Sequence, residues 1–250
     1  VSGHLRISAG VEVATGEDYM RATWYEQGDN TVAMAGNGRR LVTGDGNGML
    51  TLWDVEWNLP VAKLQAHDYA VSALAMDHTG SRVLSASADG GSLKLWRTAD
   101  LPAPSIDAAF RNWSAAQAAW ELSYEPLDEA QPPGVTAALP AEPVPPQPEQ
   151  LPRDPSSLVT LTGHSAELLD VAMDGAGELL LVATSDDAVL AWDGDTNDVT
   201  LQWDHDARMT ALAASHDGSS VLLASVYDPV VSVHDGVTGE RTALLEGHTL

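Results

Sequence analysis

Cysteine is absent from the 250 residues of this chain, which excludes disulfide bonds, thiolate zinc sites and cysteine nucleophiles. No apolar run approaches the length of a membrane span, and the first residues lack the basic-then-apolar order of a signal peptide. The length is sufficient for a sizeable buried core. We therefore expect a soluble, cytoplasmic protein with no membrane span.

Lysine is also scarce, because Lys63 and Lys94 are the only two. Acidic residues number 36 against 12 lysines and arginines, so the formal net charge is −24. Such a charge repels phosphate backbones and argues against direct nucleic-acid binding. Three interpretations of the acidity stay open: a solvated surface that maintains solubility, a protein partner with a basic surface, or adaptation to high salt.

Catalytic motifs are missing as well, since the chain has no Gly-x-Ser-x-Gly elbow and no phosphate loop. Ser215-His216-Asp217 are adjacent in one expected turn, whereas a triad needs side chains that converge from separate segments. The acidic residues of 193–204 echo a calcium loop, but Asp198 stands where that loop needs glycine. We predict no catalytic, cofactor-binding or metal-binding residue.

What the chain does contain is a repeated pattern, clearest in residues 66–97. The runs VSALAM, RVLSAS and SLKLW alternate apolar and polar residues, and the segments DHTG and ADGG between them are rich in turn formers. Alternation of period two between such segments predicts three antiparallel strands joined by tight hairpins. His67 stands just before the first of these strands, and Trp96 stands at the end of the third.

The pattern occurs four times, with nearly the same spacing between its first and last marker residues. His164 and Trp192 hold the two positions in one copy, and His205 and His234 hold them in another, where His234 occupies the tryptophan position. In a further copy Tyr25 occupies the histidine position and Trp53 the tryptophan position. Four copies at a step of roughly 40–45 residues predict four-stranded propeller blades. The predicted fold class is all-β, a β-propeller of about four full blades with partial blades at both ends.

Copies with Gly-His near the start and Trp-Asp near the end resemble WD-repeat β-propellers. The matching pairs are Gly163-His164 with Trp192-Asp193, and Trp53-Asp54. The resemblance implies a buried hydrogen-bonded chain of His, Ser or Thr, Asp and Trp within a blade, because polar groups inside an apolar blade must satisfy one another. By position these residues are His67, Ser87, Asp89 and Trp96 in one copy, and His164, Thr184, Asp186 and Trp192 in the next.

Some positions depart from the pattern. Ala66 replaces glycine, Gly90-Gly91 lengthen a hairpin by one residue, and Tyr25 and His234 replace the expected histidine and tryptophan. We expect the blades with Tyr25 and His234 to lack the full network. The resemblance implies a fold but says little about function, because the motif residues that carry it are structural.

The two ends of the chain resemble parts of repeats. Residues 1–25 match the last two strands of a blade, and Gly247-His248 repeat the pair that opens one. We expect a fragment of a longer polypeptide, since an open ring would expose strand edges. The alternative is that residues 247–250 pair beside residues 1–25 and close a small ring.

An insertion separates blades at 1–97 from blades at 157–250. It spans 98–156 and divides into a predicted helix over 105–123 and a Pro-rich linker over 126–155 that should form neither ladder nor helix. One face of the helix carries an aromatic stripe. Packing against the propeller and docking into another chain both remain open for it. The candidate partner-binding residues of the stripe are Phe110, Trp113, Trp120 and Tyr124.

These features favour a non-catalytic protein–protein interaction scaffold within a larger protein or assembly. The alternative is a sensor or regulatory propeller of a multidomain signalling enzyme, a kinase or NTPase, whose catalytic part lies outside this chain. The expected contact loops are the hairpins before the third strands and the blade junctions near the repeat histidines. They are residues 45–48, 87–91, 185–188 and 226–229, and the segments around His67, His164 and His205.

Overall fold

A computed structural model of the chain describes residues 31–56, 59–88, 91–98, 115–116, 149–150, 158–164, 166–205, 208–226 and 230–247. The chain forms two compact units, one of residues 1–100 with 149–250 and the other of residues 101–148. Among these described residues, no helix is long and apolar enough to cross a membrane.

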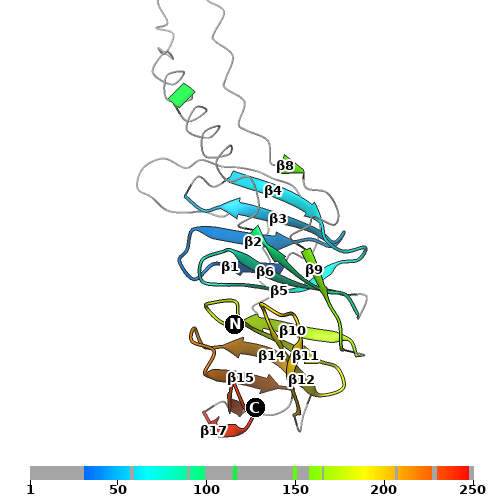
Figure 1. Ribbon diagram of the computed structural model, residues 1–250, viewed down its shortest axis with the longest axis vertical. Helices are drawn as coiled ribbons and strands as arrows, with labels where there is room; N and C mark the ends of the chain where they lie inside the picture. Colours follow the sequence, from blue (N-terminus) through cyan, green and yellow to red (C-terminus); the bar gives the residue numbers. More distant parts are fainter. Residues whose placement is uncertain are drawn as a thin grey trace, which may run out of the picture. The chain divides into compact units, whose positions relative to one another are not determined.

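The described part of the first unit consists of four sheets, each with four antiparallel strands in the order of the chain (Figure 1), and one short further strand joins the first sheet in parallel. The all-β prediction and the four-stranded blades are thus confirmed. The first blade comprises β1 (Thr31–Met34), β2 (Arg40–Gly44), β3 (Met49–Asp54) and β4 (Leu59–Gln65). The second comprises β5 (Val71–Met76), β6 (Arg82–Ser87), β7 (Leu93–Arg97) and β9 (Leu158–Leu161). The third comprises β10 (Leu168–Met173), β11 (Leu179–Thr184), β12 (Ala188–Asp193) and β13 (Val199–Asp204). The fourth comprises β14 (Met209–Ala214), β15 (Ser220–Ser225), β16 (Val231–Asp235) and β17 (Arg241–Leu245).

Neighbouring blades touch through their first strands, because β5 contacts both β1 and β10, and β10 contacts β14. The apolar positions of the alternating strands meet between blades and form the core. One buried cluster joins the second and third blades around Leu84, Leu95, Leu180 and Trp192. Another joins the third and fourth blades and includes Leu181, Met209 and Leu223.

β9 follows the insertion in sequence and pairs with β7, which completes the second blade. The Pro-rich segment also supplies β8 (Glu149–Gln150), which pairs in parallel with Ala62 and Lys63 of β4 at the edge of the first blade. The prediction that residues 126–155 form no ladder is therefore wrong at this point. Glu149 and Gln150 lie between Pro148 and Pro152 and keep the backbone N–H groups that proline lacks.

Of the second unit, the structure describes Ala115 and Ala116, which are helical. The rest of the helix predicted over 105–123 lies outside the described residues, together with the stripe of Phe110, Trp113, Trp120 and Tyr124. The partial blades predicted at residues 1–25 and at the end of the chain fall largely outside them as well.

The hairpin between the first and second strands has the same form in each blade. Its fourth residue is a glycine with a left-handed φ between 69° and 75° in all four copies, a region that side chains rarely adopt. The N–H of this glycine donates to the carbonyl of the first turn residue, at 2.8–3.3 Å. These glycines are Gly38, Gly80, Gly177 and Gly218.

Side chains at the first turn position fix the same hairpin. In the second blade the carboxylate of Asp77 accepts hydrogen bonds from the hydroxyls of Thr79 and Ser81, both at 2.7 Å, and from the N–H of Arg82 at 3.0 Å. In the third blade the carboxylate of Asp174 accepts from the backbone N–H groups of Glu178 and Leu179. These bonds satisfy backbone donors that the turn would otherwise leave open.

In the fourth blade the corresponding turn holds Asp217 as a carboxylate. Hydrogen bonds donated by the hydroxyls of Ser215 and Ser219, and then by the Ser219 N–H, lower the pKa of Asp217 from 3.8 to about 2. Because the pKa is lower in the folded state, the contribution of these bonds is present above pH about 4 and is lost as the pH falls through about 2. We expect a carboxyl carbon NMR titration to give a midpoint near 2 for Asp217.

The matched variant for this titration is Ser215→Ala. It removes the hydroxyl that lowers the pKa of Asp217 most, so the midpoint should move upward. A midpoint that stays unchanged in Ser215→Ala would contradict the assignment of the cause. The backbone fold serves as its own control, because amide shifts away from this turn should not move.

Candidate functional site

The blades have two different ends. Because successive strands are antiparallel, the hairpins between second and third strands lie at the same end as the connections from one blade to the next. We call this end the junction end; the hairpins between first and second and between third and fourth strands lie at the opposite end. The junction end contains the described loops 45–48, 66–70, 162–164, 166–167 and 185–187, with His205, Arg208 and Val226.

Backbone hydrogen bonds hold the loops of the junction end in a repeating arrangement. In the second, third and fourth blades, the residue that follows the second strand donates its N–H to the carbonyl three residues after the repeat histidine. The same bond occurs in three blades at 2.8 Å, and rigidly positioned loops lose little entropy when they bind a partner. The bonds run from Ala88 to Ala70, from Ser185 to Glu167 and from Val226 to Arg208.

Main-chain hydrogen bonds also attach two of the junctions to the preceding blade. The N–H groups of Ala66 and His67 donate to the carbonyl of Gly48, at 3.0 and 3.1 Å, and the N–H of His205 donates to the carbonyl of Asp187 at 2.7 Å. Gly48 and Asp187 occupy the same hairpin position, and both have left-handed φ values, 78° and 65°. A Cβ at Gly48 would lie 2.2 Å from the carbonyl oxygen of His67, so glycine permits the close approach.

In the second blade the repeat histidine contacts two serines that the prediction did not include. His67 is buried, with Nε2 2.8 Å from the hydroxyl of Ser85 and Nδ1 3.1 Å from that of Ser92. Ser87 is also buried, two residues further along the same strand. The Nε1 of Trp96 is buried without a hydrogen-bond partner in the described part of the chain. Asp89 lies outside the described residues.

Sequence reasoning missed Ser85 and Ser92. The first blade carries a signal that could have found Ser85, because Trp53 Nε1 donates to Thr43 Oγ1 at 3.0 Å. Thr43 lies opposite Thr51 on the ladder, and Ser85 holds the equivalent position opposite Lys94. Ser85 lies as far before Trp96 as Thr43 lies before Trp53, once the extra glycine in the hairpin of the second blade is allowed for.

In the third blade the predicted residues form two separate pairs. The Oγ1 of Thr184 lies 2.6 Å from Oδ1 of Asp186, while the ring of His164 lies edge-on to that of Trp192, with centroids 6.3 Å apart. His164 Nε2 donates to the carbonyl of Gly91 at 2.9 Å, and Trp192 Nε1 donates to the carbonyl of Thr162 at 3.1 Å.

The physical reason for the two pairs is the residue at the position of Ser85. In the third blade this position is Val182, which supplies no hydroxyl to connect the histidine with the tryptophan. In the fourth blade, where His234 replaces tryptophan, His205 Nε2 contacts Ser225 Oγ at 2.7 Å and His234 contacts Ser232 Oγ at 3.0 Å. The hydrogen-bond partners at the repeat histidine and tryptophan positions thus differ from blade to blade.

The side chains that the junction end exposes are mainly acidic. Tyr69 is 61% exposed at the tip of its junction. The exposed carboxylates of the described junction end are those of Asp68, Glu167, Asp186, Asp204 at the end of β13 and Glu246 after β17, and Arg208 is the one arginine or lysine exposed there.

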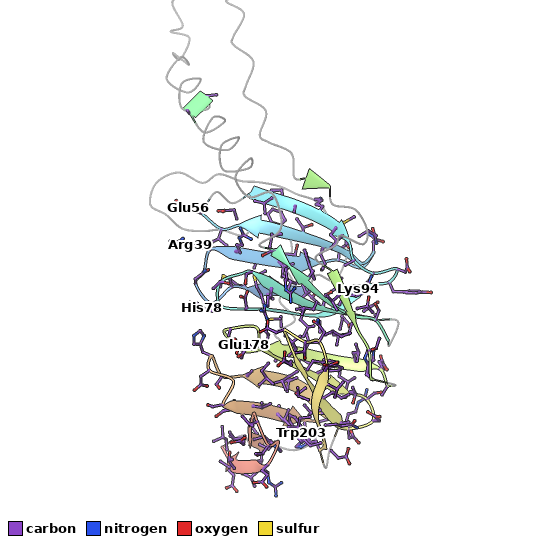
Figure 2. The ribbon with its side chains drawn as sticks, in the orientation of Figure 1. Arg39, Glu56, His78, Lys94, Glu178 and Trp203 are labelled. Carbon is purple, nitrogen blue, oxygen red and sulfur yellow. The ribbon has the colours of Figure 1, made fainter. Side chains whose placement is uncertain are left out.

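The opposite end has more basic residues. Five of the eight bases in the described part of the chain lie there, namely Arg39, Arg40, Arg82, Arg97 and Arg241. Figure 2 shows Arg39, His78 and Glu178 along this end of the sheets. Arg82 joins two blades, because it donates to the carbonyl of Gly177 and forms an ion pair with Asp195, both at 2.6 Å.

Two comparisons with known proteins bear on this arrangement. The family model described as WD domain, G-beta repeat matches residues 58–97 and 155–193. No curated protein matches the chain. The matched segments include the second blade's first three strands and the third blade's first three strands.

Proposed function

Because the WD-repeat family model matches two segments of the chain, we propose that the chain is a non-catalytic protein–protein interaction scaffold that binds its partner at the junction end. WD repeats generally serve as protein-interaction scaffolds, and the function of each resides in the loops that its fold displays. The observation that carries the proposal is the repeating set of backbone hydrogen bonds that fixes the junction-end loops.

The charge of these loops supports a partner with a basic surface. Five exposed carboxylates stand against one exposed arginine at the described junction end, and such a surface steers a cationic partner into contact. Tyr69 offers a large, exposed aromatic group on a loop whose main chain is held on both sides. Aromatic residues of this kind often contribute most of the energy of an interface.

Exposure on the fourth blade supports membership of a larger assembly. Leu64 and Leu161 each lie three residues before the repeat histidine, and both are 1% exposed; Leu161 packs in the cluster with the third blade. Leu245 holds the same position in the fourth blade and is 48% exposed. An apolar surface that neighbouring blades bury elsewhere is available here to another protein or domain.

The partner class can be tested with a fluorescent, unstructured peptide rich in lysine and arginine. We expect anisotropy titrations to show saturable binding that weakens with salt, because the attraction is largely electrostatic. The double variant Glu167→Lys with Asp204→Lys should lower the affinity at least tenfold. Tyr69→Ala should lower it as well, and this loss should persist at higher salt.

The matched control is Glu178→Lys with Glu240→Lys, which changes the net charge equally at the opposite end. We expect less than a twofold effect. If this control weakens binding as strongly as the junction-end variant, the attraction has no preferred end and the proposed contact surface is wrong.

A further inference from the structure

Two histidines from different blades meet at the opposite end. His78 and His216 are both exposed and occupy the second position of the first hairpin in the second and fourth blades. Their ring centroids lie 4.8 Å apart, with the planes inclined at 76°. No hydrogen bond engages either imidazole within the described residues. The sequence alone did not reveal this contact.

The main chain fixes both residues on Gly175 of the third blade, which lies between them. The N–H of His78 donates to the carbonyl of Gly175 at 2.9 Å, and the N–H of Gly175 donates to the carbonyl of His216 at 2.8 Å. Two residues from distant parts of the sequence are therefore held on either side of one glycine. Their relative position is set before any ligand binds.

Glycine is needed next to each ring. A Cβ on Gly175 would lie 1.9 Å from Nδ1 of His216, and a Cβ on Gly36 would lie 2.4 Å from Nδ1 of His78. Because no real Cβ approaches this closely, any side chain at either glycine would displace the ring. The two glycines therefore create the space in which the imidazoles meet.

From this geometry we propose that His78 and His216 together bind a divalent late transition metal ion, of the class of Zn²⁺ and Cu²⁺. Imidazole nitrogen is a preferred ligand of these ions. Metal–nitrogen bonds of about 2.0–2.1 Å hold two imidazole nitrogens about 3 Å apart, and rings with centroids at 4.8 Å reach this by side-chain rotation. No group of three or more metal-ligating side chains converges in the described part of the chain, so water completes the coordination.

The test uses the metal alone. Titration of the apo protein with Zn²⁺ by calorimetry should give one site per chain, and Cu²⁺ should give an electron paramagnetic resonance spectrum with two coordinated nitrogens. His78→Asn and His216→Asn should each lower the affinity at least tenfold and leave one nitrogen on Cu²⁺. Zn²⁺ should also raise the melting temperature of the unaltered protein, because it binds the folded state.

A positioning control separates a built site from general affinity for metal. Gly175→Ala keeps both histidines but displaces the ring of His216, and should lower the affinity about as much as removal of a ligand. Glu178→Gln removes an exposed carboxylate from the same hairpin and should leave the affinity unchanged. Full stoichiometry and affinity in both histidine variants, or a Cu²⁺ spectrum with fewer than two nitrogens in the unaltered protein, would overturn the proposal.

Discussion

Replacing Trp192 with alanine is expected to destabilise the folded chain by about 3–5 kcal/mol, the usual range for removal of a buried tryptophan. The side chain is fully buried in the cluster that joins the second and third blades. Its removal leaves a cavity between two blades and breaks the hydrogen bond from Nε1 to the carbonyl of Thr162. Unfolding in urea, followed by tryptophan fluorescence and circular dichroism, measures the loss.

Trp53→Ala is the matched control, because Trp53 holds the same repeat position in the first blade but is only half-buried. We expect a smaller loss for Trp53→Ala than for Trp192→Ala. Equal losses would show that the interface between the second and third blades is not the main source of the effect. An unchanged stability in Trp192→Ala would contradict the packing described above.

The second large effect is expected for Asp170→Ala, at about 2–3 kcal/mol, since buried donors without partners are costly. Asp170 is buried at a bulge in β10. Its carboxylate accepts hydrogen bonds from the N–H of Val171 at 2.9 Å and from the N–H of Leu212 in the fourth blade at 2.8 Å. In the alanine variant both backbone donors stay buried without this acceptor, and the hydrogen bond between the third and fourth blades is lost.

A comparison with Ser72→Ala isolates the effect of the partners. The Oγ of Ser72 is buried without a hydrogen-bond partner in the described residues, so its removal should be near neutral. Amide exchange adds a local readout, because the N–H of Leu212 should exchange faster in Asp170→Ala. If Asp170→Ala loses no more stability than Ser72→Ala, the carboxylate does not link the blades.

The strands were predictable because the alternating runs and the hairpin segments recur at a constant step. RVLSAS, for example, coincides with β6, and the glycine of DHTG has the left-handed φ that the turn requires. Both signals are local, because each depends only on residues that are close together in the sequence.

The contacts that build the sites were not predictable, because they join residues distant in sequence. Ser85 and Ser87 lie on the same face of one strand, so alternation could not decide which hydroxyl meets His67. At the position of Asp170 the second and fourth blades carry Ala73 and Ala211, so the repeat gave no hint of a buried carboxylate. β8 depends on a dipeptide between prolines that finds a strand edge in a distant part of the sequence.

A row of main-chain hydrogen bonds connects the hairpins of the opposite end. The N–H of Asn37 donates to the carbonyl of His78, His78 to Gly175, and Gly175 to His216, at 2.8–2.9 Å. These bonds connect four blades and do not depend on the side chains of the residues that form them. At the second hairpin position the four blades carry Gly36, His78, Gly175 and His216 in turn, so the surface chemistry alternates from blade to blade while main-chain bonds connect every pair of neighbours.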